Sequence, residues 1–457
     1  MDGYYSWMLI SASLVLMMTT PALALFYGGM SRTKSVLNMM MMSFSATGIV
    51  GLTYVLWGWS MSFSSLGWAA ADPQDPGWDF ATLFANPFDQ FGLQGTQPAN
   101  YVFVAFQLTF AVITAALISG AIADRVKFSA WIVFVPIWIT ASYFPMAHMV
   151  WGGGFLSNAA GGLADVIFSG DGSAAVAPID YAGGTVVHIN AGVAGLVLAL
   201  IIGVRRGFGK EPMKPHNLTL TMIGAGLLWF GWFGFNAGSI VFTSTKESEM
   251  ITQFTTETGL VWINTTTATC AAMIGWLVVE RVRDGKATSL GAASGVVAGL
   301  VAITPACGAL SPLGAIGLGL IAGALCALAV GLKFRVGFDD SLDVVGVHLV
   351  GGLVGTIGVG LFSTSTGLLY GAGVRQLIVQ VAVALFAVAW SAAATLIVGL
   401  GIKYSMGWRI SDEAELDGID FAEHGESAYE FGSRSGAMVH GPVAVSRQTT
   451  LQEQGSS

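Results

Sequence analysis

The sequence predicts an all-α membrane protein with eleven transmembrane helices, its N-terminus outside the cell and its C-terminus inside. The composition, the number of apolar segments and the placement of the cations all point to this fold. Of the 457 residues, 54% are hydrophobic and only 10% are charged, whereas a soluble domain carries roughly 25% charged residues. Such a chain cannot cover a water-facing surface, and no basic patch is large enough for a nucleic-acid partner.

The eleven segments are each long enough to cross a bilayer, which takes about 20 apolar residues. The first is too long for a signal peptide and has no basic residue before it, so we expect it to be retained. The predicted spans are 7–30, 37–63, 100–123, 128–148, 182–204, 217–241, 256–280, 289–306, 311–331, 342–362 and 376–403.

The orientation follows from the lysines and arginines. With the N-terminus outside, 17 of the 19 cations fall in inside segments, and only Lys246 and Arg375 remain outside. Cytoplasmic loops carry such an excess of cations. The pattern therefore predicts a multi-pass protein of the cell inner (plasma) membrane, N-terminus out and C-terminus cytoplasmic.

The chain divides into a transmembrane domain, 1–403, and a polar tail. Eight of the acids lie between Asp412 and Glu430, so the tail alone accounts for the net charge of −8. We expect 404–431 to be an amphipathic, acidic cytoplasmic region, and the alternative is a solvated tail. The remainder, 432–457, is rich in Ser, Gly and Gln and is expected to be disordered.

Two matching motifs predict an internal repeat. Each has an aspartate eight residues before a histidine and glycines four and seven residues after it. The first copy is Asp180, His188, Gly192 and Gly195, and the second is Asp340, His348, Gly352 and Gly355. The copies lie on spans five and ten, so the halves 7–204 and 217–362 have opposite topology, with span eleven outside them. Inverted repeats of this kind form many transporters, with a substrate site near the midplane.

The two histidines are the main candidates for a pore. An ionisable residue inside a span is costly and usually faces a cavity or a partner. Buried imidazoles should be mainly neutral, each with one donor and one acceptor nitrogen, so two adjoining rings can share a proton. The alternative is two core histidines, each bonded to a backbone carbonyl. No third ligand has metal-site spacing, and Cys270, Cys307 and Cys326 are expected to be core residues.

Six stretches carry long motifs in a fixed order: Pro21–Met30, Ala147–Gly154, Asp180–Arg205, Gly231–Ser239, Glu415–Asp420 and His424–Tyr429. They resemble the ammonium transporter (Amt/Mep/Rh) family, and the two tail motifs resemble the bacterial Amt type. The resemblance covers about residues 5 to 431 and implies eleven spans in a homotrimer, each subunit with its own pore.

The resemblance also implies a role for each candidate site residue. Phe106, Phe110, Trp151 and Ser239 match an outer ammonium recruitment site. Phe110 and Phe235 match two stacked rings that close the pore, Trp232 matches a ring in the lumen, and His188 and His348 match twin pore histidines. Asp180 matches an acid that supports the recruitment region.

Each of these residues also has a structural interpretation. The aromatic residues also fit an interfacial belt, Asp180 fits a helix cap, and Ser239 fits a donor to its own backbone.

The expected function is ammonium uptake: NH4+ is recruited outside, deprotonated, and conducted as NH3 past the histidines, with the proton routed separately. The expected partners are ammonium or methylammonium, the lipid bilayer, further copies of the chain in a trimer, and a PII-type regulatory protein at the cytoplasmic face. The alternatives are an ammonium sensor acting through such a partner and an Rh-like gas channel. No nucleophile–base set, phosphate loop or metal cluster favours an enzyme, and no cofactor or metal is expected.

Overall fold

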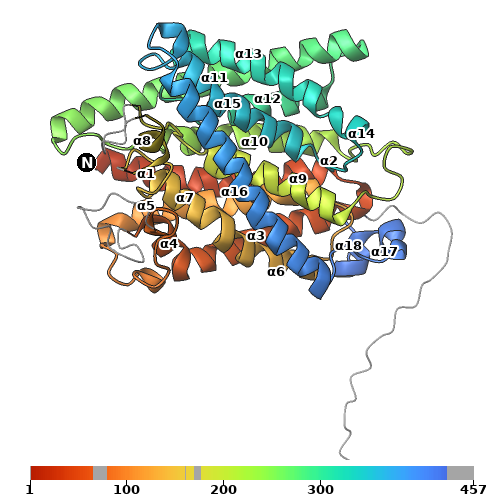
Figure 1. Ribbon diagram of the computed structural model, residues 1–457. Helices are drawn as coiled ribbons and strands as arrows, with labels where there is room; N and C mark the ends of the chain where they lie inside the picture. Colours follow the sequence, from red (N-terminus) through yellow and green to blue (C-terminus); the bar gives the residue numbers. More distant parts are fainter. Residues whose placement is uncertain (1, 65–79, 160, 169–175, 430–457) are drawn as a thin grey trace, which may run out of the picture.

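The structure is a computed structural model that describes residues 2–64, 80–159, 161–168 and 176–429 (Figure 1). Within these residues the chain forms helices and no strand, apart from two isolated bridges. The predicted all-α fold is confirmed. The segment expected to be disordered, 432–457, lies outside the described residues.

The first half of the chain holds five helical segments, four of which change from α-helical to π-helical geometry along their length. Their parts are α1 (Asp2–Met17), η1 (Met18–Leu23) and α2 (Ala24–Met30); α3 (Val36–Thr53), η3 (Tyr54–Gly58) and α4 (Trp59–Phe63); α5 (Tyr101–Ile118) and η7 (Ser119–Ile122); α6 (Phe128–Trp138), η8 (Ile139–Tyr143) and α7 (Phe144–Trp151); and η9 (Gly184–Ile189) and α9 (Asn190–Ile202). A short helix, α8 (Leu163–Phe168), precedes the fifth segment.

The second half holds six segments and the tail helices. They are α10 (Leu218–Ala237); α11 (Glu247–Asp284); α12 (Ser289–Ile303); α13 (Pro312–Ala329) and α14 (Leu332–Val336); η10 (Val345–Leu349) and α15 (Val350–Phe362); α16 (Arg375–Ser405); and α17 (Asp412–Asp417) and α18 (Ile419–His424). Short 3-10 turns lie at Thr33–Ser35, Phe80–Thr82, Phe91–Leu93, Pro98–Asn100 and Leu368–Tyr370.

Ten helical segments among the described residues are long and apolar enough to cross a membrane. The segment expected at 289–306 is also helical, but α12 has only 15 residues, fewer than the roughly 20 that a perpendicular span needs. The count of eleven spans therefore stays a prediction. The seventh segment is longer than predicted at both ends, since α11 runs for 38 residues.

Glycine lets two of these helices, α11 and α13, pack closely. A Cβ atom built on Gly319 of α13 would lie 2.2 Å from the Ala268 carbonyl oxygen of α11, and one on Gly323 would lie 2.0 Å from that of Ala272. Small residues at helix contacts are typical of membrane proteins, where backbones gain by approaching closely. The high glycine content, 61 residues, is therefore partly explained by packing.

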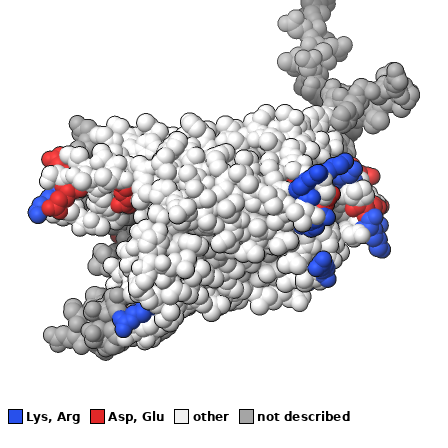
Figure 2. Space-filling model, turned by 90° about the horizontal axis from the view of Figure 1, so that it is seen from above, with Lys and Arg blue, Asp and Glu red and all other residues white. Residues whose placement is uncertain are grey.

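The outer surface has the distribution that a bilayer requires. Figure 2 shows a broad uncharged flank, with charged side chains gathered toward the two ends of the molecule. Figure 1 places the start of the chain at one end and the tail helices α17 and α18 at the other. An odd number of crossings would give this arrangement, so it supports the predicted topology.

Candidate functional site

The first histidine lies on a turn that begins with a capping carboxylate. Asp180 Oδ1 accepts hydrogen bonds from the backbone N–H of Gly183 (2.9 Å) and Gly184 (2.5 Å), and Oδ2 accepts one from Thr185 N (2.9 Å). The Thr185 hydroxyl donates to the same carboxylate. Free N–H groups at a helix start favour a carboxylate, so Asp180 fixes the start of the π-helical turn that carries His188.

The second histidine repeats this local structure. Asp340 accepts hydrogen bonds from Val344 N (3.0 Å) and Val345 N (2.7 Å), at the start of the π-helical turn that carries His348. The matching motifs therefore adopt matching conformations. This similarity supports the predicted internal repeat and gives Asp180 a structural role, whatever its effect on a substrate.

The two repeat helices cross where each has a glycine. A Cβ atom on Gly192 would lie 2.5 Å from Leu349 N, and one on Gly352 would lie 3.1 Å from Ile189 N. Residue 189 of the first helix contacts residue 352 of the second, and residue 192 contacts residue 349, so the residue numbers rise along one helix and fall along the other. The helices therefore cross with opposite chain directions, as an inverted repeat requires.

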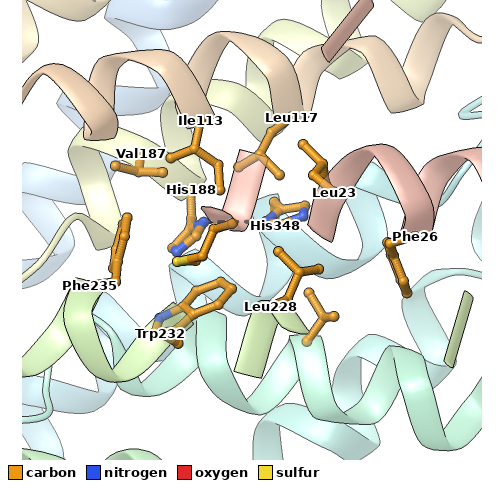
Figure 3. Close-up of a pocket in the computed structure, with 12 residues that line it drawn as sticks. Leu23, Phe26, Ile113, Leu117, Val187, His188, Leu228, Trp232, Phe235 and His348 are labelled. Atoms are coloured by element: carbon orange, nitrogen blue, oxygen red, sulfur yellow. Dashed lines mark hydrogen bonds between the residues drawn. The ribbon is translucent and has the colours of Figure 1, made fainter. Parts of the chain in front are cut away.

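This crossing brings the two imidazoles together in the interior (Figure 3). His188 Nδ1 and His348 Nδ1 are 3.2 Å apart, and the ring centroids are 5.3 Å apart with 25° between their planes. Both side chains are buried. The separation fits an N–H···N hydrogen bond, so one ring carries its proton on Nδ1 and the other accepts. His188 Nε2 has no hydrogen-bond partner in the described part of the chain.

The histidines line a narrow cavity whose walls are otherwise apolar (Figure 3). The lining residues are Met18, Leu23, Phe26, Ile113, Leu117, Val187, His188, Leu228, Trp232, Phe235, Val297 and His348. The cavity volume is about 10 Å³, close to the roughly 10–15 Å³ that one water molecule needs. A guest the size of water or ammonia fits here, but a hydrated ion does not.

Trp232 presents its ring face to this cavity. Its ring lies 5.5 Å from that of His188 with 20° between their planes. Its indole N–H donates to Thr304 Oγ1 (2.8 Å), which lies 3.3 Å from Asn236 Oδ1. Because Thr304 holds the N–H, the imidazole edges are the polar groups left to contact a guest.

Stacked aromatic rings adjoin the cavity. The rings of Phe110 and Phe235 are 4.0 Å apart and nearly parallel, and Phe106 lies 4.8 Å from Phe110. Trp151 meets Phe110 edge to face at 6.0 Å. Phe235 lies 6.3 Å from the His188 ring. The three phenylalanines are fully buried, and the series of contacts is continuous from Trp151 to the histidines.

Trp151 and Ser239 are the half-buried members of the candidate recruitment site. The Trp151 indole N–H donates to the Asp180 carbonyl (2.9 Å), and the Ser239 hydroxyl donates to the Phe235 carbonyl (2.8 Å). Ser239 thus makes the backbone bond that its structural interpretation predicts. A hydroxyl that donates its hydrogen still has lone pairs to accept another bond.

A buried ion-pair network lies beyond the histidines, at the end of the molecule where the tail docks. Arg205 binds Asp339 through Nε and Nη2, both at 2.9 Å, and Asp124 through Nη1 at 2.8 Å; Arg32 also pairs with Asp124 (3.1 Å). Burial alone would raise the pKa of Asp124, but the Arg205 and Arg32 guanidiniums and hydrogen bonds lower it overall. The pKa of Asp339 is lowered in the same way, mainly by Arg205.

The described part of the tail docks on its own chain. Asp420 accepts a hydrogen bond from Asn38 N (2.8 Å) at the start of α3, and Glu423 accepts one from Phe128 N (2.8 Å) at the start of α6. Burial raises the pKa of Asp420, although the backbone N–H groups oppose this shift. These two residues are therefore docked on the body of their own chain and are not part of a solvated tail.

Sequence reasoning missed two groups that hold the candidate site in place. Thr304 fixes the ring of Trp232, and Gln380 fixes the segment before Asp180. A polar residue inside an apolar span is the signal that would have found both. The π-helical turns at the histidines have no comparable signal in the sequence.

The chain was compared with known proteins. The profile described as Ammonium Transporter Family matches residues 6–429. An ammonium transporter of Mycobacterium tuberculosis is 50% identical over 97% of this chain and 93% of its own length, and one of Aquifex aeolicus is 42% identical over 93% of each. Among solved structures, Candida albicans Mep2 has a TM-score of 0.75 at 28% identity over 90% of this chain and 87% of its own. A structure described as Sensor Amt Protein has a TM-score of 0.76 at 27% identity over 92% and 98%.

Proposed function

Because this chain belongs to the ammonium transporter family, we propose that it takes up ammonium through a pore within each subunit. The observation that carries the proposal is the bonded pair of buried histidines, 3.2 Å apart, in a cavity just large enough for one small molecule. We assign transport and not an enzymatic reaction. The substrates are ammonium and its analogue methylammonium.

Recruitment takes place at Phe106, Phe110, Trp151 and Ser239. Ammonium has four N–H donors and a positive charge. Aromatic faces attract such a cation by about 0.5–2 kcal/mol each, and a hydroxyl oxygen adds roughly 1 kcal/mol. The bonded N–H of Trp151 and the bonded O–H of Ser239 support this role, because they leave a ring face and lone pairs for the cation. Asp180 adds a negative charge close behind the site.

The ion cannot continue past the stacked rings as a cation. The idealised cost of moving a small ion into an apolar medium is of order 20 kcal/mol, and several kcal/mol remain after relaxation. Phe110 and Phe235 stand in the way, and the cavity behind them is apolar except for its imidazoles. Ammonium therefore loses a proton at or below the recruitment site, and neutral ammonia crosses. Potassium has no proton to lose and is excluded by desolvation.

The histidine pair provides ammonia with both kinds of hydrogen bond. When the rings share one hydrogen through Nδ1, the donor ring has a bare Nε2 and the acceptor ring has an Nε2–H. Ammonia can donate to the first and accept from the second. The unpartnered Nε2 of His188 supports this role, since a buried polar atom without a partner is costly. The same pair can carry the proton on its separate route.

The proposed topology is eleven spans, N-terminus outside and C-terminus cytoplasmic, in the inner (plasma) membrane. Domain 1–403 forms the pore. The subunits assemble as a homotrimer, and the docked region 404–431 is placed where a PII-type protein would meet the cytoplasmic mouth. The docking contacts of Asp420 and Glu423 support an ordered tail.

A sensor function is the alternative with specific support, because one of the similar structures is a sensor protein of the Amt type. An Rh-like gas channel is disfavoured by the Trp151 and Ser239 positions. The sensor and transporter functions differ in flux. A transporter moves methylammonium at a rate that scales with the amount of protein in the membrane, whereas a sensor function alone does not require such flux.

The test uses the full chain in proteoliposomes. Currents on ammonium, methylammonium and potassium jumps are recorded beside protein-free liposomes. We expect responses to ammonium and methylammonium and none to potassium. No current on any of them, together with no methylammonium uptake, would contradict transport, and equal responses to potassium and ammonium would contradict the deprotonation step.

A further inference from the structure

Gln380 is a buried polar residue in α16, a helix that lies outside the repeat. Its Oε1 accepts a hydrogen bond from Ile179 N (2.9 Å), and its Nε2 donates to the Ile179 carbonyl (2.8 Å). The amide thus pairs with one residue in the way that a neighbouring β-strand would. Nε2 also donates to the Thr356 carbonyl of α15 (3.0 Å). The side chain is fully buried.

Gln376, one turn earlier in α16, extends this contact. Its Nε2 donates to the Ala177 carbonyl (3.1 Å) and to Gln380 Oε1 (3.1 Å). Gln380 therefore makes four hydrogen bonds, two through each polar atom, which is the full capacity of an amide. The two glutamines together hold the extended segment 177–179 against α16.

The residue that Gln380 holds is directly followed by Asp180. Asp180 caps the turn of His188 through its carboxylate, and its backbone carbonyl accepts a hydrogen bond from the Trp151 indole. A shift of Ile179 would therefore move the acid, the aromatic ring and the start of the histidine turn together.

The second half of the repeat holds the equivalent position with a charge. Asp339 precedes Asp340 as Ile179 precedes Asp180, and its carbonyl accepts a hydrogen bond from Arg125 Nη2 (2.7 Å). A guanidinium in the outer half would repel a cationic substrate. A neutral amide binds the matching carbonyl without that charge, and its oxygen also accepts the backbone N–H of Ile179, which a guanidinium cannot do.

We infer that Gln380 is a positioning residue for ammonium recruitment: it fixes the Asp180 segment while keeping positive charge away from it. This inference rests on the proposed function. It assigns a task to the eleventh helix, which the inverted repeat does not require. Loss of the amide should weaken substrate binding without slowing passage through the histidine pair.

The experiment compares Gln380→Met and Gln376→Met with the wild type in proteoliposomes, using methylammonium flux at several concentrations. Gln380→Met keeps the side-chain length but removes every hydrogen bond. We expect its KM to rise about five- to tenfold with little change in kcat. Gln376→Met leaves both Ile179 bonds intact, and its KM should rise about twofold.

Thr395→Val is the matched control, since Thr395 is a buried, hydrogen-bonded residue of the same helix whose partner is Trp138. Its KM should equal that of the wild type. Hydrogen exchange of the 177–187 segment provides a readout independent of transport, and it should be faster in Gln380→Met.

The inference is overturned if folded Gln380→Met keeps the wild-type KM, whether or not its kcat falls. It is also overturned if exchange is unchanged in folded Gln380→Met. If Gln380→Met is not recovered as folded protein, Gln376→Met becomes the test. A wild-type KM and unchanged hydrogen exchange of the 177–187 segment in that variant would then overturn the inference. Absence of flux in the wild type is a different outcome, which contradicts the proposed function itself.

Discussion

Replacing His188 and His348 together by leucine tests the central element of the pore. The substitution keeps the cavity apolar and similar in size but removes both Nε2 edges. Each ring can make one hydrogen bond with a passing ammonia, and such a bond contributes about 1 kcal/mol. Loss of both raises the barrier by about 2 kcal/mol, which corresponds to a roughly thirtyfold slower flux.

The assay measures methylammonium uptake and ammonium- and potassium-induced currents in proteoliposomes that contain equal amounts of folded protein. Leu228→Met is the control, because it lines the same cavity and changes its volume and polarity little. We expect near wild-type flux for the control. If the double variant keeps flux within about twofold of wild type and discriminates ions as before, the histidines are not part of the pathway.

Four further predictions concern the rings, the ion pairs (two of them) and the tail. Phe110→Ala removes one ring of the stacked pair, so the KM for methylammonium should rise about tenfold in the uptake assay; an unchanged KM would exclude the ring from recruitment. Arg205→Met leaves Asp124 and Asp339 short of their main counter-charge and should cost about 3–5 kcal/mol of stability, seen as a lower melting temperature. Because the pKa of both acids is lowered in the folded state, the ion pairs stabilise the folded protein above about pH 4. This stabilisation is lost as the pH falls through the folded-state pKa values. A melting temperature of the wild type that falls between about pH 8 and 5 because of these acids would contradict this prediction. Truncation after Lys403 removes the docked tail and should lower uptake per folded protein, whereas equal uptake would show that the tail does not influence the pore.

Much of the fold was predictable because membrane spans follow from simple rules. A run of about 20 apolar residues has few alternatives to a helix in lipid, so every predicted span coincides with a helix. Helix ends were less predictable. The extension of α11 to Glu247 contains charged residues, which no hydropathy rule assigns to a span.

The candidate site was predictable to the level of residue identity but not of geometry. The repeated motif around His188 and His348 was visible as spacing, and the capping role of Asp180 followed from its position before a helix. The direction of an indole N–H, as in Trp232 with Thr304, depends on a contact 72 positions away in the chain. The same is true of Gln380, whose partner Ile179 is 201 positions distant. Such partners become visible only when the helices are packed.

The contact of Gly192 with Leu349, and of Gly352 with Ile189, limits how the molecule can move. Backbones that already touch cannot come closer, and α9 and α15 cannot separate there without opening a void in the bundle. The width of the histidine cavity at this crossing is therefore set by backbone contacts. Changes in that width are expected from rotation of the aromatic and imidazole side chains, which is fast, and not from movement of whole helices, which is slow.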